Sequence, residues 1–110
     1  MKDADADTFQ SDFCAEQLKT LGEPLRLRII DLLRYGEMAV SDIAEFLEVE
    51  VVMASHHLKV LKHAKLVTPR REGRYIYYSL EKDLLKRSGK DRQYLDLGCC
   101  RLEVPPASSD

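Results

Sequence analysis

The stretch from Val40 to Leu80 constrains the fold most, because three local patterns follow one another there without a gap. A short apolar stripe predicts one helix that ends near Leu47, and a longer amphipathic segment, Val52–Lys65, predicts a second helix. Two β-type runs follow, Leu66–Pro69 and Arg74–Leu80. We therefore expect a mainly α-helical fold of about five helices and two strands, in which a helix-turn-helix precedes a small β-hairpin wing.

The predicted second helix has two different faces. At 100° per residue, Ala54, Leu58 and Leu61 fall on one side, where they can pack against a core. The opposite side offers hydrogen-bond donors and cations, as a helix that enters the major groove of DNA requires. A solvated surface helix would show the same division, so the helix alone does not decide between the two. The residues of this second face are Val52, Ser55, His56, Lys59, Lys62 and His63.

The predicted hairpin turns at Glu72-Gly73, where glycine can adopt the positive φ that a tight turn needs. Three arginines, Arg70, Arg71 and Arg74, cluster at its tip. Arginine at such a tip suits contact with phosphates or insertion into a narrow minor groove, although an ordinary soluble turn is also charged. The helix and the tip together predict binding to double-stranded DNA.

The charge of the chain is strongly segregated, although its net charge is only −2. Residues 1–50 hold 5 Lys/Arg and 12 Asp/Glu, whereas residues 51–92 hold 11 Lys/Arg and 4 Asp/Glu. The basic block therefore coincides with the second helix and the wing. A positive region confined to one part of a chain is the expected electrostatic footprint of a DNA-binding protein.

Four segments in order resemble the ArsR/SmtB family of bacterial winged-helix repressors: LKTLGEPLRLRIIDLL, SDIAEFL, ASHHLKVLKHAKLV and REGRYIYYSL. The resemblance runs from Leu18 to Leu80. It implies a homodimer that binds an operator and leaves it when an effector binds, with a dimer interface made by the first and last helices, here Phe9–Leu21 and Asp83–Leu97. One departure is the apolar and acidic start of the second helix, Glu50–Met53, where the family usually has Ser, Thr, Gln or Pro.

Length and composition predict one domain of 110 residues, with a disordered acidic arm over 1–8, the winged helix-turn-helix domain over 9–97 and a C-terminal tail over 98–110. The chain shows neither a signal peptide nor an apolar run long enough to cross a membrane, so we expect a cytoplasmic protein without a membrane partner. Three cysteines in such a chain predict reduced thiols instead of structural disulfides. A phosphate-binding loop, a carboxylate pair and a nucleophile elbow are all missing, so we do not expect an enzyme.

The resemblance also guides the search for an effector, and no cofactor is expected to be required. The family's Cys-x-Cys site for soft metals is replaced here by Ala39 and Ser41, and the zinc site of its last helix lacks histidine. Some arsenic-responsive members carry a vicinal pair like Cys99-Cys100 near the C-terminus. With Cys14 on the first helix, this pair could give trigonal sulfur coordination to a thiophile such as As(III).

Two further interpretations of the thiols remain open. Cys99 and Cys100 could respond to oxidants or persulfides, or all three cysteines could simply be packing residues in a regulator without a thiol effector. A winged helix used for protein contact is the alternative to DNA binding, and it would require an apolar face on the second helix.

Overall fold

The computed structural model describes residues 7–107, and residues 1–6 of the predicted acidic arm lie outside this range. Four helices occur in the described part of the chain, all of them before the wing and in the predicted order. Their bounds are α1 Ser11–Leu21, α2 Pro24–Leu33, α3 Val40–Leu47 and α4 Val51–His63.

Local chemistry explains where the first two helices begin. The carboxylate of Asp7 accepts hydrogen bonds from the Ser11 backbone N–H at 2.9 Å and from its hydroxyl at 3.1 Å, just before α1. Glu23 is the N-cap of α2, and its Oε1 accepts from the backbone N–H groups of Leu25 and Arg26 at 2.7 and 3.1 Å. Pro24 occupies the first turn of α2. Backbone N–H groups there make no hydrogen bond within the helix, so proline, which lacks this group, costs the helix nothing.

The wing is a hairpin of β2, Val67–Glu72, and β3, Tyr75–Leu80, with Gly73 at φ 62° in its turn. A two-residue strand, β1 (Met38–Ala39), pairs with β3 on its other side, so the wing sheet has the order β1-β3-β2. The sequence had not predicted β1, because two residues are too few to show a period. This third strand ties the base of the wing to the start of α3.

The predicted last helix is wrong, and with it the total of about five helices and two strands. The part of the chain that the structure describes forms four helices and six strands in two sheets. Instead of a helix over Asp83–Leu97, β4 (Leu85–Ser88), β5 (Arg92–Asp96) and β6 (Arg101–Val104) make an antiparallel sheet of order β4-β5-β6. Gly89 lies in the β4–β5 turn at φ 79°.

The physical reason lies in the alternation of buried and accessible side chains. Gln93, Leu95 and Leu97 are buried, whereas Tyr94 and Asp96 between them are partly accessible. A period of two places every second side chain on the core side of a sheet, and no helix could bury this set on one face. β6 lies within the region predicted as a C-terminal tail, so this part of residues 98–110 is joined to the folded domain.

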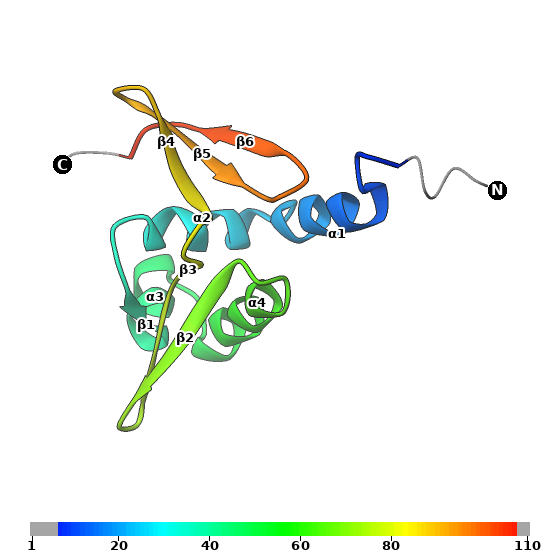
Figure 1. The fold of residues 1–110 in the computed structure, drawn as a ribbon. Helices are drawn as coiled ribbons and strands as arrows, with labels where there is room; N and C mark the ends of the chain where they lie inside the picture. Colours follow the sequence, from blue (N-terminus) through cyan, green and yellow to red (C-terminus); the bar gives the residue numbers. More distant parts are fainter. Residues whose placement is uncertain (1–6, 108–110) are drawn as a thin grey trace.

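Figure 1 shows α1 and α2 running through the middle of the molecule, with the β4–β6 sheet on one side and α3, α4 and the wing on the other. One core connects these layers. Ile29 of α2, Leu58 of α4 and Leu95 of β5 are all at most 1% exposed and belong to the same buried cluster. The helix-turn-helix is therefore held from behind by α2, which leaves the outer face of α4 uncovered. Within residues 7–107, none of the helices is long and apolar enough to cross a membrane.

Candidate nucleic-acid interface and cysteine cluster

The outer face of α4 carries a row of side chains at helical spacing, which we call the α4 stripe: Val52, His56, Lys59 and His63. All four are exposed, and Val52 has 81% of its surface accessible. The residues at the opposite side of the helix, Ala54, Leu58 and Leu61, are fully buried. The sequence prediction of two faces therefore agrees with the accessibility of these side chains. Ser55, at the edge of the stripe, is half-buried.

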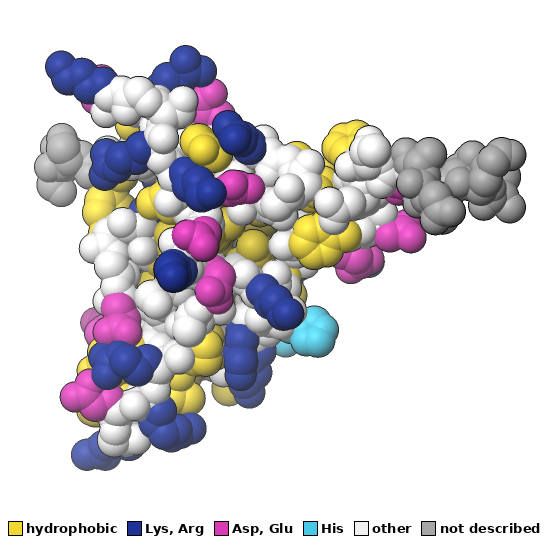
Figure 2. Space-filling model, in the orientation of Figure 1, with side chains coloured by type: hydrophobic (Ala, Val, Ile, Leu, Met, Phe, Trp, Pro, Cys, Tyr) yellow, Lys and Arg dark blue, Asp and Glu magenta, His cyan; other side chains and the backbone are white. Residues whose placement is uncertain are grey.

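Beside the stripe lies a hollow of about 810 Å³ between α4 and the wing, which we call the α4–wing groove. Its described lining contains four cations and no carboxylate, so a negatively charged ligand would meet uncompensated positive charge there. Figure 2 shows Lys and Arg side chains gathered over the wing and beside a projecting histidine. The groove is lined by Lys59, Lys62, His63, Lys65, Pro69, Arg71, Ile76 and Tyr78.

Lys65 is a groove residue that the sequence analysis missed. The predicted second helix extends through Lys65, but α4 ends at His63 and Lys65 has φ 63°. The chain has left the helix before Lys65, so the helical period does not give the direction of this side chain. The side chain is exposed and lines the groove.

The three wing arginines differ in their surroundings. Arg71 stands opposite Ile76 in the β2–β3 register and faces the α4–wing groove. Arg74 is exposed in the turn beside Gly73, with its guanidinium 5.8 Å from the centre of the Tyr75 ring. Arg70 stands opposite Tyr77 on the other side of the sheet, where its guanidinium lies 4.9 Å from that ring.

Arg70 is also engaged by two carboxylates. It donates to Glu37 at 2.9 and 2.8 Å and to Glu72 at 2.6 Å. The hydrogen bonds with Arg70 lower the pKa of the Glu37 carboxyl, while Glu37 and Glu72 together raise the pKa of Arg70. Arg70 is thus a predicted wing contact whose charge is already compensated by Glu37 and Glu72.

His57 lies on the flank of α4 and contacts α2. Its Nδ1 lies 3.2 Å from Nη1 of Arg26. Because arginine only donates, Nδ1 must accept, which requires a neutral ring with the proton on Nε2. Burial lowers the pKa of His57, and nearby Arg26 and His56 lower it further, against the attraction of Glu23. This histidine therefore helps to join α4 to α2.

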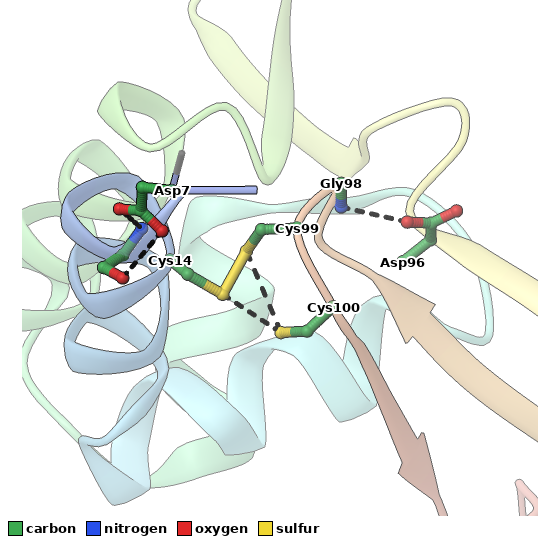
Figure 3. Close-up of a disulfide and its surroundings, with 7 residues drawn as sticks. Asp7, Cys14, Asp96, Gly98, Cys99 and Cys100 are labelled. Carbon is green, nitrogen blue, oxygen red and sulfur yellow. Dashed lines mark hydrogen bonds between the residues drawn. A yellow bond between two sulfur atoms is a disulfide. The ribbon is translucent and has the colours of Figure 1, made fainter. Parts of the chain in front are cut away.

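Away from the α4 stripe and the α4–wing groove, three cysteines lie together. They are Cys14, Cys99 and Cys100, which we call the cysteine cluster, and their three Sγ atoms all lie within 4.8 Å of one another. Figure 3 shows Cys14 projecting from α1 toward the β5–β6 turn, where it forms a disulfide with Cys99. Cys100 is a free thiol, with its Sγ 3.3 Å from that of Cys14 and 3.9 Å from that of Cys99.

The expectation of reduced thiols is wrong for this structure, since Cys14 and Cys99 are paired across 85 residues. Sequence spacing could not reveal the pairing, because it depends on the β4–β6 sheet folding back against α1. Cys14 is buried, whereas Cys99 and Cys100 are half-buried. The grouping of Cys14 with the vicinal pair, which the sequence analysis considered, is present in the fold.

The sequence of this chain is similar to a helix-turn-helix family model and to known transcriptional repressors. A family model described as a helix-turn-helix domain matches residues 21–70. The transcriptional repressor SdpR of Bacillus subtilis (strain 168) is 41% identical over 70 residues, which are 64% of this chain and 78% of that protein. The arsenical resistance operon repressor of Staphylococcus xylosus is 35% identical over 85 residues, 74% of this chain and 82% of that protein.

A solved structure also resembles the chain. The homodimeric winged helix-turn-helix DNA-binding domain of a possible ArsR-family regulator from Mycobacterium bovis superposes with a TM-score of 0.63 at 38% identity. The match covers 73% of this chain and 70% of that one. These relatives are transcriptional regulators and not enzymes. Together with the α4 stripe and the wing, they show that the chain belongs to the ArsR/SmtB family of winged helix-turn-helix transcriptional repressors.

Proposed function

We propose that this chain represses transcription as a homodimer that places α4 in the major groove of an operator. The observation that carries the proposal is the continuity of the exposed α4 stripe with the basic α4–wing groove. Apart from Lys59, the stripe would face the edges of the bases, whereas Lys59, the other cations of the groove and the wing would contact the sugar-phosphate backbone. The residues assigned to base edges are Val52, Ser55, His56 and His63, and those assigned to phosphates are Lys59, Lys62, Lys65, Arg71 and Arg74.

The electrostatic part of this proposal is tested by the salt dependence of binding. Each phosphate contact releases counterions, so the logarithm of the affinity falls with the logarithm of salt concentration by about 0.9 per contact. Fluorescence anisotropy with a labelled duplex gives this slope for wild type, Lys62→Ala and Arg71→Ala. Lys90→Ala is the matched control, because Lys90 is an exposed lysine in the distant β4–β5 turn. Removal of a phosphate contact reduces the slope by about one, and the control leaves it unchanged.

The homodimer needs an interface, and the expectation that the last helix supplies it no longer applies, because residues 85–104 form strands. We assign the interface to α1 and the segment before it. Phe9, Phe13 and Leu18 are 64%, 48% and 46% exposed, a degree of apolar exposure that association with a second copy would remove. Light scattering on Leu18→Glu tests this assignment: the variant should be monomeric where wild type is dimeric.

We further propose that the cysteine cluster is the effector site. When its cysteines are reduced, it would bind a soft metalloid, As(III). A dithiol reductant exchanges with the Cys14–Cys99 disulfide: it gives up two electrons and two protons, is itself oxidised to a disulfide, and leaves three cysteine thiols facing one another. Three thiols and As(OH)₃ then form three S–As bonds and release three water molecules. Thiolates are the ligands that soft ions prefer, and the relative from Staphylococcus xylosus is named as an arsenical resistance operon repressor.

The position of the cluster supports a link to DNA binding. It joins α1, to which we assign the dimer interface, to the β5–β6 turn. A metalloid held by all three sulfurs would fix these two elements differently from the disulfide, and so change the angle between the two copies of α4. A 100-fold preference of As(III) for the non-binding form corresponds to about 2.7 kcal/mol of coupling.

The experiment measures operator affinity of the reduced chain as As(III) or Zn(II) is added. As(III) should weaken binding and Zn(II) should not. Cys100→Ser is the matched variant, because it keeps the disulfide pair and removes the third sulfur. If Cys100→Ser responds to As(III) as wild type does, the three-sulfur site is wrong. If oxidation alone changes operator affinity and As(III) does not, the cluster is instead a redox switch of Cys14 and Cys99.

A further inference from the structure

Val52 is the most exposed of the large apolar side chains within residues 7–107, with 81% of its surface accessible. It is the second residue of α4, in the first turn of that helix. Burial of apolar surface stabilises a fold or a complex, so a valine left this open contributes little to the stability of the folded chain. Its side chain is instead open to a molecule that binds the outer face of α4.

Val52 begins the α4 stripe. His56, Lys59 and His63 follow it at spacings of four, seven and eleven residues, which places all four on one side of a helix. Val51 and Met53 each point about 100° away from this side. A ligand that contacts Lys59, His56 and His63 along this side of α4 therefore also lies next to the methyl groups of Val52.

The chemistry of the side chain limits what it can recognise. Valine neither donates nor accepts a hydrogen bond, so it cannot distinguish bases by their donor and acceptor groups. In the major groove the base edges present one apolar group, the C5-methyl of thymine. Residues near the N-terminus of a recognition helix are those that contact base edges. A β-branched side chain is also stiff about χ1, so little rotamer freedom is lost when it is held against a methyl group.

We infer that Val52 is a specificity-determining residue that reads thymine through its 5-methyl group, at one position in each half of the operator. This inference rests on the proposed insertion of α4 into the major groove. It assigns a chemical partner to the one member of the α4 stripe that has no polar group. Cytosine methylated at C5 would present the same group at the same place in the groove.

Uracil provides a direct test, because it pairs as thymine does and differs only by the missing methyl group. Duplexes that bind the full chain are first selected from a random pool, and single thymines are then replaced by uracil. Loss of one methyl contact, at about 0.8 kcal/mol per buried carbon, should reduce affinity about 4-fold for each half-site. The effect should be confined to one thymine in each half.

The variant Val52→Ser should bind thymine and uracil duplexes with equal affinity, since it lacks the apolar surface. Helix content measured by circular dichroism checks that α4 is retained, which is expected because serine and valine have similar helix propensity and the site is exposed. Met53→Ala is the matched control: it removes a neighbouring exposed apolar side chain on another side of the helix and should keep the 4-fold discrimination.

The outcomes separate the inference from the proposed function. If wild type binds selected duplexes but tolerates uracil at every thymine, or if Val52→Ser discriminates as wild type does, the role of Val52 is overturned and DNA binding stands. If wild type shows no salt-dependent binding to any duplex, the proposed function fails and the inference fails with it.

Discussion

The guanidinium of Arg70 holds the carboxylate of Glu37 with two hydrogen bonds, 2.9 Å from Nε and 2.8 Å from Nη2, across 33 residues of sequence. Glu37 immediately precedes β1, so this pair fastens the back of the wing to the loop before α3. Within one cluster of arginines the fold thus separates Arg70, which holds the wing, from Arg71, which faces the α4–wing groove.

We predict that Arg70→Ala and Arg71→Ala have different effects on DNA binding. Arg71→Ala should weaken binding to all duplexes alike and reduce the salt slope by about one, because an uncompensated charge near the phosphates is lost. Arg70→Ala should leave the slope nearly unchanged, because Glu37 and Glu72 already compensate its charge. Anisotropy titrations at several salt concentrations measure both slopes. Equal slopes for the two variants would contradict the assignment.

A base-reading role for His56 predicts a sequence-dependent effect. His56→Ala should cost about 1–3 kcal/mol of binding free energy on a selected operator and much less on random DNA. The side chain is exposed, so the fold should be unaffected. Competition between the operator and random duplexes measures the ratio. Equal losses on both kinds of DNA would mean that His56 contacts the backbone instead of a base.

The neutral state of His57 predicts a pH dependence of stability. Its pKa is lowered in the folded chain, mainly by burial, from an ordinary value of 6.5. The unfolded chain therefore binds more protons in this range, and stability rises with pH. The stabilisation that neutral His57 contributes is complete above pH 6.5, and it is lost as the pH falls through the lowered pKa of the folded chain. Urea unfolding measured between about pH 7 and pH 5 should show that the free energy of unfolding falls more steeply for wild type than for His57→Gln.

The disulfide predicts a difference in stability between the oxidised and reduced chain. Closing a loop between Cys14 and Cys99, which are 85 residues apart, restricts the unfolded chain. The loop-entropy model gives about 4.6 kcal/mol for a loop of this size. Denaturant unfolding with and without a thiol reductant measures the difference. Cys100→Ser should show the same difference as wild type, whereas Cys14→Ser should show none.

The C-terminal sheet predicts that residues beyond the wing contribute to the common core. Leu95 is 1% exposed in β5, and truncating a buried leucine costs about 2–5 kcal/mol. Leu95→Ala should lower the unfolding free energy by that amount. Arg87→Ala, at an exposed position of β4, should change it by less than about 0.5 kcal/mol. A small effect of Leu95→Ala would mean that the sheet does not share the core of α2 and α4.

The sequence by itself determined the elements whose signal is local. The burial of Ala54, Leu58 and Leu61 and the exposure of Val52 and His56 follow from a period of 3.6 residues that lasts over three turns of α4. The hairpin at Gly73 follows from a turn residue between two β-type runs. Both patterns are set by neighbours within a few residues, so they are readable without knowledge of the rest of the chain.

Tertiary structure decided the features that depend on distant partners. The segment expected as a last helix forms β4 and β5, and part of the expected tail forms β6, because strands of four or five residues show their alternation only weakly and need hydrogen bonds from other strands. The same sheet brings Cys99 to Cys14, and the fold of the wing brings Arg70 to Glu37. Each of these pairings is set by which surfaces pack against the core. Local periodicity carries no information about that choice.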